Sequence, residues 1–331
     1  MGHQAFTGTL FREGMVSRLN FTAKEARGMG ISRRAFLKYC IGSSALLGLD
    51  AMMVGKLSKL LAGTEQMPTV IWLEGAGCSG CTISLTNLIG SSADAGPTSV
   101  EDLLVNYINL AFGKTLMAAA GDQAVSNLRA AQNSGNFILV VEGGIPTAFG
   151  GMACTVATEN GTDITMSDIV QELAPLANKV VCVGACACFG GIPAAGANPT
   201  AIRSVSELTG IATVNIPGCP PHPDWIAGSL ALLLCGTNPA LDADGRPTAF
   251  FGTSVHANCP KKPLYDSSHF ATTFGQEGRC LRNLGCSGPE TGADCALRGW
   301  NNGFNYCMQS NGNCIGCTES DYPKAKLVVR P

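Results

Sequence analysis

Short apolar runs alternate with segments of helical periodicity between residues 69 and 234. The runs predict buried strands at residues 69–73, 136–141, 179–183 and 213–216. Apolar side chains that recur three or four positions apart predict helices at residues 82–89, 123–132, 167–176 and 224–234. This alternation predicts an α/β fold, in which helices cover both faces of a parallel sheet.

After Asn238 the pattern changes. Gly, Asn and Cys become frequent, and the apolar periodicity fades. We therefore expect three parts: a signal segment over residues 1–64, an α/β domain over 65–238, and an irregular, mostly helical and loop domain over 239–331. The last part has too few apolar residues for an independent core, so bound metal is expected to supply the missing cohesion.

The first part has the pattern of an export signal. Arg33 and Arg34 lie in the run Ser-Arg-Arg-Ala-Phe-Leu-Lys, ahead of a modest apolar stretch over residues 40–54. That stretch is too short to span a bilayer, and no longer one follows. The arrangement is typical of the twin-arginine signal, although a basic helix start is an alternative. We expect a periplasmic or otherwise extracytoplasmic protein without a membrane anchor of its own.

Charge is sparse along the whole chain. Only 14% of the 331 residues are charged, 46% are hydrophobic, and the formal net charge is −2. Without basic runs, nothing in the sequence suggests binding to nucleic acid or to an anionic membrane surface. A weakly charged surface instead suggests that part of it is buried against a partner protein.

Sixteen cysteines give the strongest chemical signal. Eleven of them and one histidine form three groups with the spacing of iron–sulfur ligands. The groups are Cys78, Cys81, Cys154 and Cys186; then His256, Cys259, Cys280 and Cys286; then Cys295, Cys307, Cys314 and Cys317. Ligands of an α/β sheet lie beyond the carboxyl ends of its strands, which is where the first group is expected. One cluster suffices for one redox step, so three groups predict an electron relay.

The cysteines and glycines also allow two other interpretations. An exported binding protein stabilised by disulfides or zinc is the main alternative, but dense disulfides belong mostly to small domains, and compact zinc modules have narrower gaps. The run Gly75-x-Gly77-x-x-Gly80 also matches a dinucleotide-binding fingerprint. Cysteines occupy or flank its variable positions, and no acidic residue follows at the expected point, so a cluster is the better match.

With these residues in view, the chain resembles the small subunit of nickel–iron hydrogenases over residues 68–322. The resemblance rests on several motifs, which are Cys78-Ser79-Gly80-Cys81, Glu142-Gly143-Gly144-Ile145-Pro146, the run from Gly184 to Gly191, the run from Asn215 to Pro223, His256-x-x-Cys259, the run from Leu284 to Pro289, and Cys314-Ile315-Gly316-Cys317. A small subunit of the respiratory complex I type shares the first domain but lacks the tail from His256 to Cys317, so the tail argues against it.

The resemblance implies a flavodoxin-like first domain and three clusters. It assigns the first group to a proximal four-iron cluster, the second to a distal four-iron cluster, and Cys295, Cys314 and Cys317 to a medial cluster. It implies no catalytic residue in this chain, because hydrogen is split or formed at a nickel–iron centre in a separate large subunit. The external acceptor implied is a cytochrome c or a membrane quinone-linked carrier.

The medial site departs from the commonest pattern of the family. Many members hold a three-iron cluster there, with Pro where this chain has Cys307. The run from Trp300 to Cys307 resembles the nickel–iron–selenium branch, as does Gly77 before Cys78. A fourth thiolate keeps a fourth iron and lowers the potential. All three clusters are therefore expected to be four-iron clusters; a buried free Cys307 beside a three-iron cluster is the alternative.

Several further residues lie near the expected clusters. Cys182 and Cys235 are expected to be buried thiols, Cys188 to point away from the cluster, and Cys219 to have a structural role beside it. Glu74 and Glu142 end two predicted strands, where they either carry protons and bind the partner or are solvated loop carboxylates.

Overall fold

The computed structural model describes residues 68–88, 99–106, 108–234, 236–300 and 303–323. The predicted signal with Arg33 and Arg34 lies outside the described residues, as do Cys40 and Cys235. Within the described ranges, no helix has the length and apolar character needed to cross a membrane.

Five parallel strands form the central sheet in the order β2–β1–β3–β7–β9. Their bounds are β1 (Thr69–Glu74), β2 (Asn109–Phe112), β3 (Phe137–Glu142), β7 (Lys179–Val183) and β9 (Val214–Ile216). All four predicted strands are confirmed, and the order is that of flavodoxin-like sheets. The strand that the pattern missed is β2, a four-residue strand at the sheet edge.

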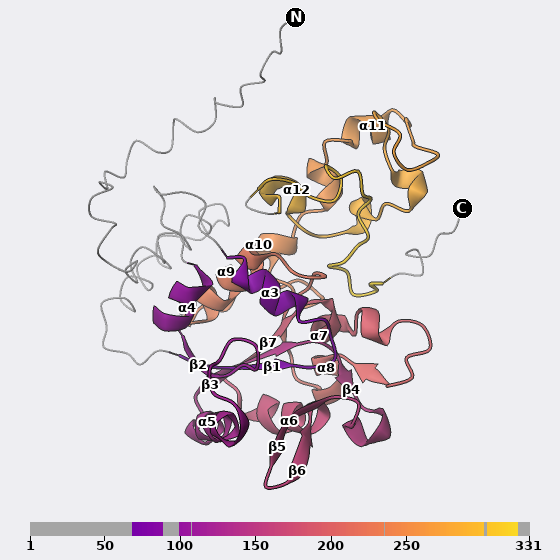
Figure 1. Cartoon of the computed structure of the whole chain (residues 1–331). Helices are drawn as coiled ribbons and strands as arrows, with labels where there is room; N and C mark the ends of the chain where they lie inside the picture. Colours follow the sequence, from indigo (N-terminus) through magenta and orange to yellow (C-terminus); the bar gives the residue numbers. More distant parts are fainter. Residues whose placement is uncertain (1–67, 89–98, 107, 235, 301–302, 324–331) are drawn as a thin grey trace, which may run out of the picture.

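Helices cover both faces of the sheet (Figure 1). One face carries α3 (Gly80–Thr86), α4 (Val100–Asn106) and α9 (Pro223–Leu234); the other carries α5 (Gly121–Ser134) and α6 (Met166–Leu173). Because side chains alternate along a strand, Val70 and Trp72 of β1 join the core under α9, whereas Ile71 and Leu73 join the core under α5 and α6. The predicted α/β fold class is confirmed.

Shorter elements connect the strands of the sheet. They are β4 (Ile145–Pro146), η1 (Ala148–Gly151), η2 (Ala174–Leu176), α7 (Ala185–Phe189), η3 (Ile192–Ala194), β8 (Ile202–Arg203) and α8 (Val205–Thr209). A hairpin of β5 (Thr155–Glu159) and β6 (Thr162–Thr165) begins directly after Cys154. Its Asn160-Gly161 turn has positive φ at both residues, 50° and 77°, as a two-residue hairpin turn favours.

The C-terminal region consists of short helical turns joined by loops. Its elements are α10 (Thr248–Phe251), η4 (Val255–Asn258), α11 (Lys262–Asp266), η5 (Arg282–Leu284), η6 (Gly288–Glu290) and α12 (Cys295–Arg298). Phe250, Phe251 and Tyr306 belong to the same hydrophobic cluster as Trp225 of α9. The region therefore shares the core of the neighbouring sheet face, in addition to any cohesion that metal supplies.

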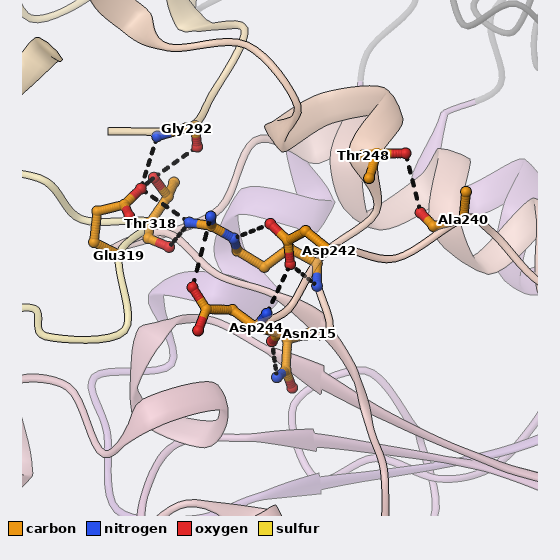
Figure 2. A network of polar contacts seen from close by, with 9 residues as sticks. Asn215, Ala240, Asp242, Asp244, Thr248, Gly292, Thr318 and Glu319 are labelled. Carbon is orange, nitrogen blue, oxygen red and sulfur yellow. Dashed lines mark hydrogen bonds and ion pairs between the residues drawn. The ribbon is translucent and has the colours of Figure 1, made fainter. Parts of the chain in front are cut away.

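A buried arginine ties the start of this region to its last cysteine loop. Arg246 donates from Nη1 to the Thr318 carbonyl and to Glu319 Oε1, both at 2.9 Å, and from Nε to Asp242 Oδ2 at 2.8 Å. Glu319 in turn accepts from the Gly292 backbone N–H at 2.7 Å (Figure 2). Since Thr318 follows Cys317 directly, this network fixes the position of the last cysteine loop.

Candidate iron–sulfur sites

The carboxyl ends of four strands meet at one edge of the sheet. Glu74 of β1 is in register with Glu142 of β3, which is in register with Val183 of β7, and Val183 pairs with Ile216 of β9. The loops that follow these residues carry Cys78, Cys81, Cys186 and Cys219. Residues more than a hundred positions apart in sequence are thus brought to one place, as predicted from the strand pattern.

Two glycines at this edge leave room for cysteine sulfurs. A Cβ atom at Gly184 would lie 2.4 Å from Cys81 Sγ, and the φ of Gly184 is 89°. Similarly, a Cβ atom at Gly80 would lie 3.0 Å from Cys78 Sγ. Glycine at both positions lets the cysteine sulfurs approach the backbone of the neighbouring turn.

The sulfurs at this edge act on one another. The pKa of Cys186 is raised to about 11, chiefly by burial and then by the nearby thiols of Cys219 and Cys78. The pKa of Cys81 is raised chiefly by burial, then by Glu142 and Cys186. Thiols held this close together do not all ionise unless a cation neutralises them, which is what the irons of a cluster do.

Cys154 lies directly before the β5–β6 hairpin and is half-buried. Burial raises the pKa of its thiol, and Lys114 opposes that rise. Its grouping with Cys78, Cys81 and Cys186 stays a prediction.

Glu142 fixes the loop that carries Cys81. Its carboxylate accepts from the backbone N–H of Cys81 at 3.1 Å and of Thr82 at 3.0 Å, as well as from the Trp72 indole N–H at 3.3 Å and the Thr82 hydroxyl. Burial raises the pKa of Glu142. Glu74 is buried too and accepts from the Thr115 hydroxyl at 2.9 Å. The alternative of solvated loop carboxylates is therefore wrong for both residues.

The second group lies in the C-terminal region. Burial raises the pKa of Cys280, and the thiols of Cys286 and Cys259 add to the rise. The His256 ring stacks edge-on against Tyr265, with ring centroids 4.4 Å apart. Burial lowers the pKa of His256, which favours the neutral imidazole that a metal requires.

In the third group, Cys295, Cys307 and Cys314 lie within electrostatic range of Cys317, and their role as ligands of one cluster stays a prediction. The pKa of Cys317 is raised by burial and then by Cys295, Cys314 and Cys307. Burial raises the pKa of Cys295 to about 12, whereas a hydrogen bond from Trp300 lowers it. Cys307, the residue that replaces Pro, thus lies among the other three thiols. Cysteine donors in this number fit an iron–sulfur cluster.

The second and third groups approach each other at Gly288. A Cβ atom at Gly288 would lie 3.5 Å from Cys286 Sγ and 3.8 Å from Cys314 Cβ. Cys286 moreover contributes to the raised pKa of Cys314. The two groups are therefore close neighbours.

The other described cysteines have separate positions. Cys182 and Cys188 are buried in the core under α5 and α6, where the Cys188 thiol donates to the Cys182 carbonyl at 3.4 Å. Cys219 lies between the first and third groups. Its backbone N–H donates to the Cys317 sulfur, and its thiol raises the pKa of Cys186. Sequence spacing gave no sign of this double contact.

All fourteen cysteines that the structure describes are free thiols. Among all the residues that the structure describes, no group of three or more His, Cys, Asp and Glu side chains is arranged to hold a single metal ion. The disulfide framework is therefore not present in the described part of the chain.

Comparison with known proteins matches both parts of the chain. Residues 78–233 match the family model of the NADH ubiquinone oxidoreductase 20 Kd subunit, and residues 251–329 match that of the C-terminal part of the NiFe/NiFeSe hydrogenase small subunit. The periplasmic [NiFeSe] hydrogenase small subunit of Desulfomicrobium baculatum is 42% identical over 90% of this chain and 98% of its own length. The periplasmic [NiFe] hydrogenase small subunit of Solidesulfovibrio fructosivorans is 37% identical over 88% and 90%.

Solved structures agree with these relatives. The recombinant [NiFeSe] hydrogenase from Desulfovibrio vulgaris Hildenborough matches with a TM-score of 0.73 and 41% identity, over 80% of this chain and 97% of that one. The actinobacterial-type NiFe-hydrogenase from Ralstonia eutropha H16 matches with a TM-score of 0.71 and 30% identity, over 80% and 82%.

A flavodoxin-like sheet with cysteine groups at its carboxyl edge and in a loop-rich tail defines a redox subunit with iron–sulfur ligands. The chain belongs to the family of NiFe/NiFeSe hydrogenase small subunits, the electron-transfer partners of the large subunit that holds the catalytic site.

Proposed function

We propose that this chain relays electrons through three four-iron clusters. Cys78, Cys81, Cys154 and Cys186 hold the proximal cluster. His256, Cys259, Cys280 and Cys286 hold the distal cluster, and Cys295, Cys307, Cys314 and Cys317 hold the medial cluster. The clusters supply reversible one-electron storage when bound.

The observation that carries this proposal is the grouping of the thiols. In each group, sulfurs from distant positions raise one another's pKa, and Cys307 does so together with Cys295 and Cys314. Cys219 and Gly288 connect the three groups in the order proximal, medial, distal. This order supports a relay that runs from the sheet edge into the C-terminal region.

The relay implies a partner at each end. The carboxyl edge of the sheet is covered by a hydrogenase large subunit, at the place where Ile83, Phe149 and Met152 expose apolar side chains beside the proximal cysteines. A cytochrome c or a membrane quinone-linked carrier exchanges electrons at the distal end. Arg33 and Arg34 direct export of the folded complex by the twin-arginine route to the periplasm. Replacement of both residues by Lys tests this role in export.

Electron resonance of the air-oxidised enzyme tests the medial assignment. A three-iron cluster is paramagnetic when oxidised, whereas an oxidised four-iron cluster with four protein ligands is silent. We expect no three-iron signal from the wild type and about one spin per molecule from Cys307→Pro, because that variant lacks the fourth thiolate.

Cys188→Ala is the matched control, since it removes a thiol that packs in the other core. A three-iron signal of about one spin per molecule in the intact wild type would show that Cys307 is not a ligand.

A further inference from the structure

Tyr306 has a buried hydroxyl without a partner. The residue is 4% exposed, and its backbone is fully engaged: its N–H donates to Gln309 Oε1 at 3.0 Å, and its carbonyl accepts from the N–H groups of Gln309 and Ser310. The phenol Oη, in contrast, completes no hydrogen bond of ordinary geometry in the part of the chain that the structure describes. Buried hydroxyls are rarely left so, since an unmade hydrogen bond is destabilising.

The neighbours of this hydroxyl are sulfurs. Tyr306 packs in one hydrophobic cluster with Cys286 and Cys314, and Cys259 and Cys295 pack against that cluster. After burial, the side chain of Cys259 raises the pKa of the phenol most, as a hydrogen-bond acceptor, and the charges of Cys259, Cys295 and Cys286 add to that rise. Two of them belong to the proposed distal site and one to the medial site. The phenol thus lies between the two sites.

The phenol suits a donor role rather than a ligand role. A tyrosine phenol is protonated at neutral pH and therefore offers one O–H donor. Thiolate and sulfide sulfurs of a cluster accept hydrogen bonds, and such bonds are among the factors that set cluster potentials. An unpaired donor beside Cys259 and Cys286 matches that need.

We infer that Tyr306 donates a hydrogen bond from Oη to a sulfur of the distal cluster and thereby raises the reduction potential of that cluster. This inference rests on the proposed function, because it requires a cluster at His256, Cys259, Cys280 and Cys286. The donor stabilises the additional negative charge of the reduced form more than it stabilises the oxidised form. Tyr306 is thus a tuning residue at the junction of the medial and distal sites.

A redox titration of the intact complex, followed by electron resonance, tests this role. The nitrogen coupling of the histidine ligand identifies the signal of the distal cluster. Tyr306→Phe removes one oxygen atom and keeps the ring. At a fixed potential, the ratio of reduced to oxidised distal cluster should fall roughly twofold to tenfold, as loss of one hydrogen bond of ordinary strength gives.

Tyr322→Phe is the matched control. Tyr322 is also a buried phenol beside sulfurs, but its neighbours are Cys219, Cys317 and Cys186. This variant should leave the distal ratio unchanged. Tyr306→Trp, which retains an N–H donor on an aromatic ring, should stay close to the wild type and provides a second test if the phenylalanine variant assembles poorly.

Different results would contradict the role of Tyr306 and the proposed function. An unchanged distal ratio in Tyr306→Phe, or a ratio in Tyr306→Trp that departs from the wild type as far as a variant without a donor, would overturn the role of Tyr306 alone. A wild-type complex without any histidine-coupled cluster signal would overturn the proposed function and this inference together.

Discussion

At Gly184 the backbone turns from β7 into α7 through a conformation that only glycine adopts readily, with φ 89° and ψ 153°. The space that a side chain would fill holds the sulfur of Cys81. The conformation and the packing therefore both require glycine here. At Gly210, φ is also positive, at 70°, but no atom lies within 4 Å of where a Cβ would stand.

These two glycines give a matched pair of alanine variants. Gly210→Ala should cost about 1–2 kcal/mol of stability from backbone strain and leave the clusters intact. Gly184→Ala should also displace Cys81, so the purified chain should lose the proximal cluster, about four irons per molecule. Iron analysis and visible absorption measure this difference. Full iron content in Gly184→Ala would mean that the Cys81 sulfur does not need this close approach.

The positions of Cys78, Cys81 and Cys186 after parallel strands predicted that these thiols gather, because the carboxyl ends of parallel strands share an edge, whereas the full ligand sets stay predictions. The sequence pattern did not predict the position of Cys219 against Cys317, the anchoring of Cys81 by Glu142, or the hydroxyl of Tyr306 between two sites. These contacts join residues that are far apart in sequence and belong to no repeated pattern. Only the packed chain brings them together.

Among the elements, buried strands were predictable and marginal ones were not. The runs under β1, β3, β7 and β9 are continuous and apolar, as strands buried on both faces require. The edge strand β2 has only four residues, and three of them are not fully buried. The β5–β6 hairpin carries a clear Asn-Gly turn signal, but its strands are largely polar and solvent-facing, so apolar runs do not reveal it.

The short C-terminal elements depend on their anchors. Arg246 is 8% exposed and links Asp242, before α10, to Thr318 and Glu319, after the last cysteine pair (Figure 2). Because removal of one partner leaves buried charges uncompensated, Arg246→Met should lower the free energy of unfolding by about 3–5 kcal/mol.

Denaturant unfolding of the complex measures this loss, with Arg129→Met as the control. Arg129 also pairs with two glutamates, Glu159 and Glu172, but these pairs are open to solvent, which screens them. The control should shift the unfolding midpoint far less. Equal shifts in both variants would contradict an anchoring role for the buried network.

On the scale of the whole molecule, the two ends of the sheet differ. The carboxyl edge gathers cysteines and exposed apolar side chains, including Phe149, which is 72% exposed and held at a positive φ of 56°. At the opposite, amino end of β7 lies Leu176, which is 48% exposed. If the carboxyl edge is covered by the large subunit, Phe149 contributes to the interface and Leu176 does not.

Aspartate variants of these two residues test the interface. Phe149→Asp should weaken association with the large subunit at least about tenfold, since a buried aromatic anchor is replaced by a desolvated charge. Leu176→Asp should leave association unchanged. Sedimentation of the mixed subunits gives both values. Equal affinities for wild type and Phe149→Asp would place the interface elsewhere.

Reduction of the chain by hydrogen tests electron transfer most directly. In the intact heterodimer, hydrogen should bleach the broad visible absorption of the clusters in this subunit, and an added oxidant should restore it. The chain without its partner should keep the absorption under hydrogen. A heterodimer that turns over hydrogen while the small subunit is colourless, or remains unbleached, would contradict the role of this chain as the electron relay.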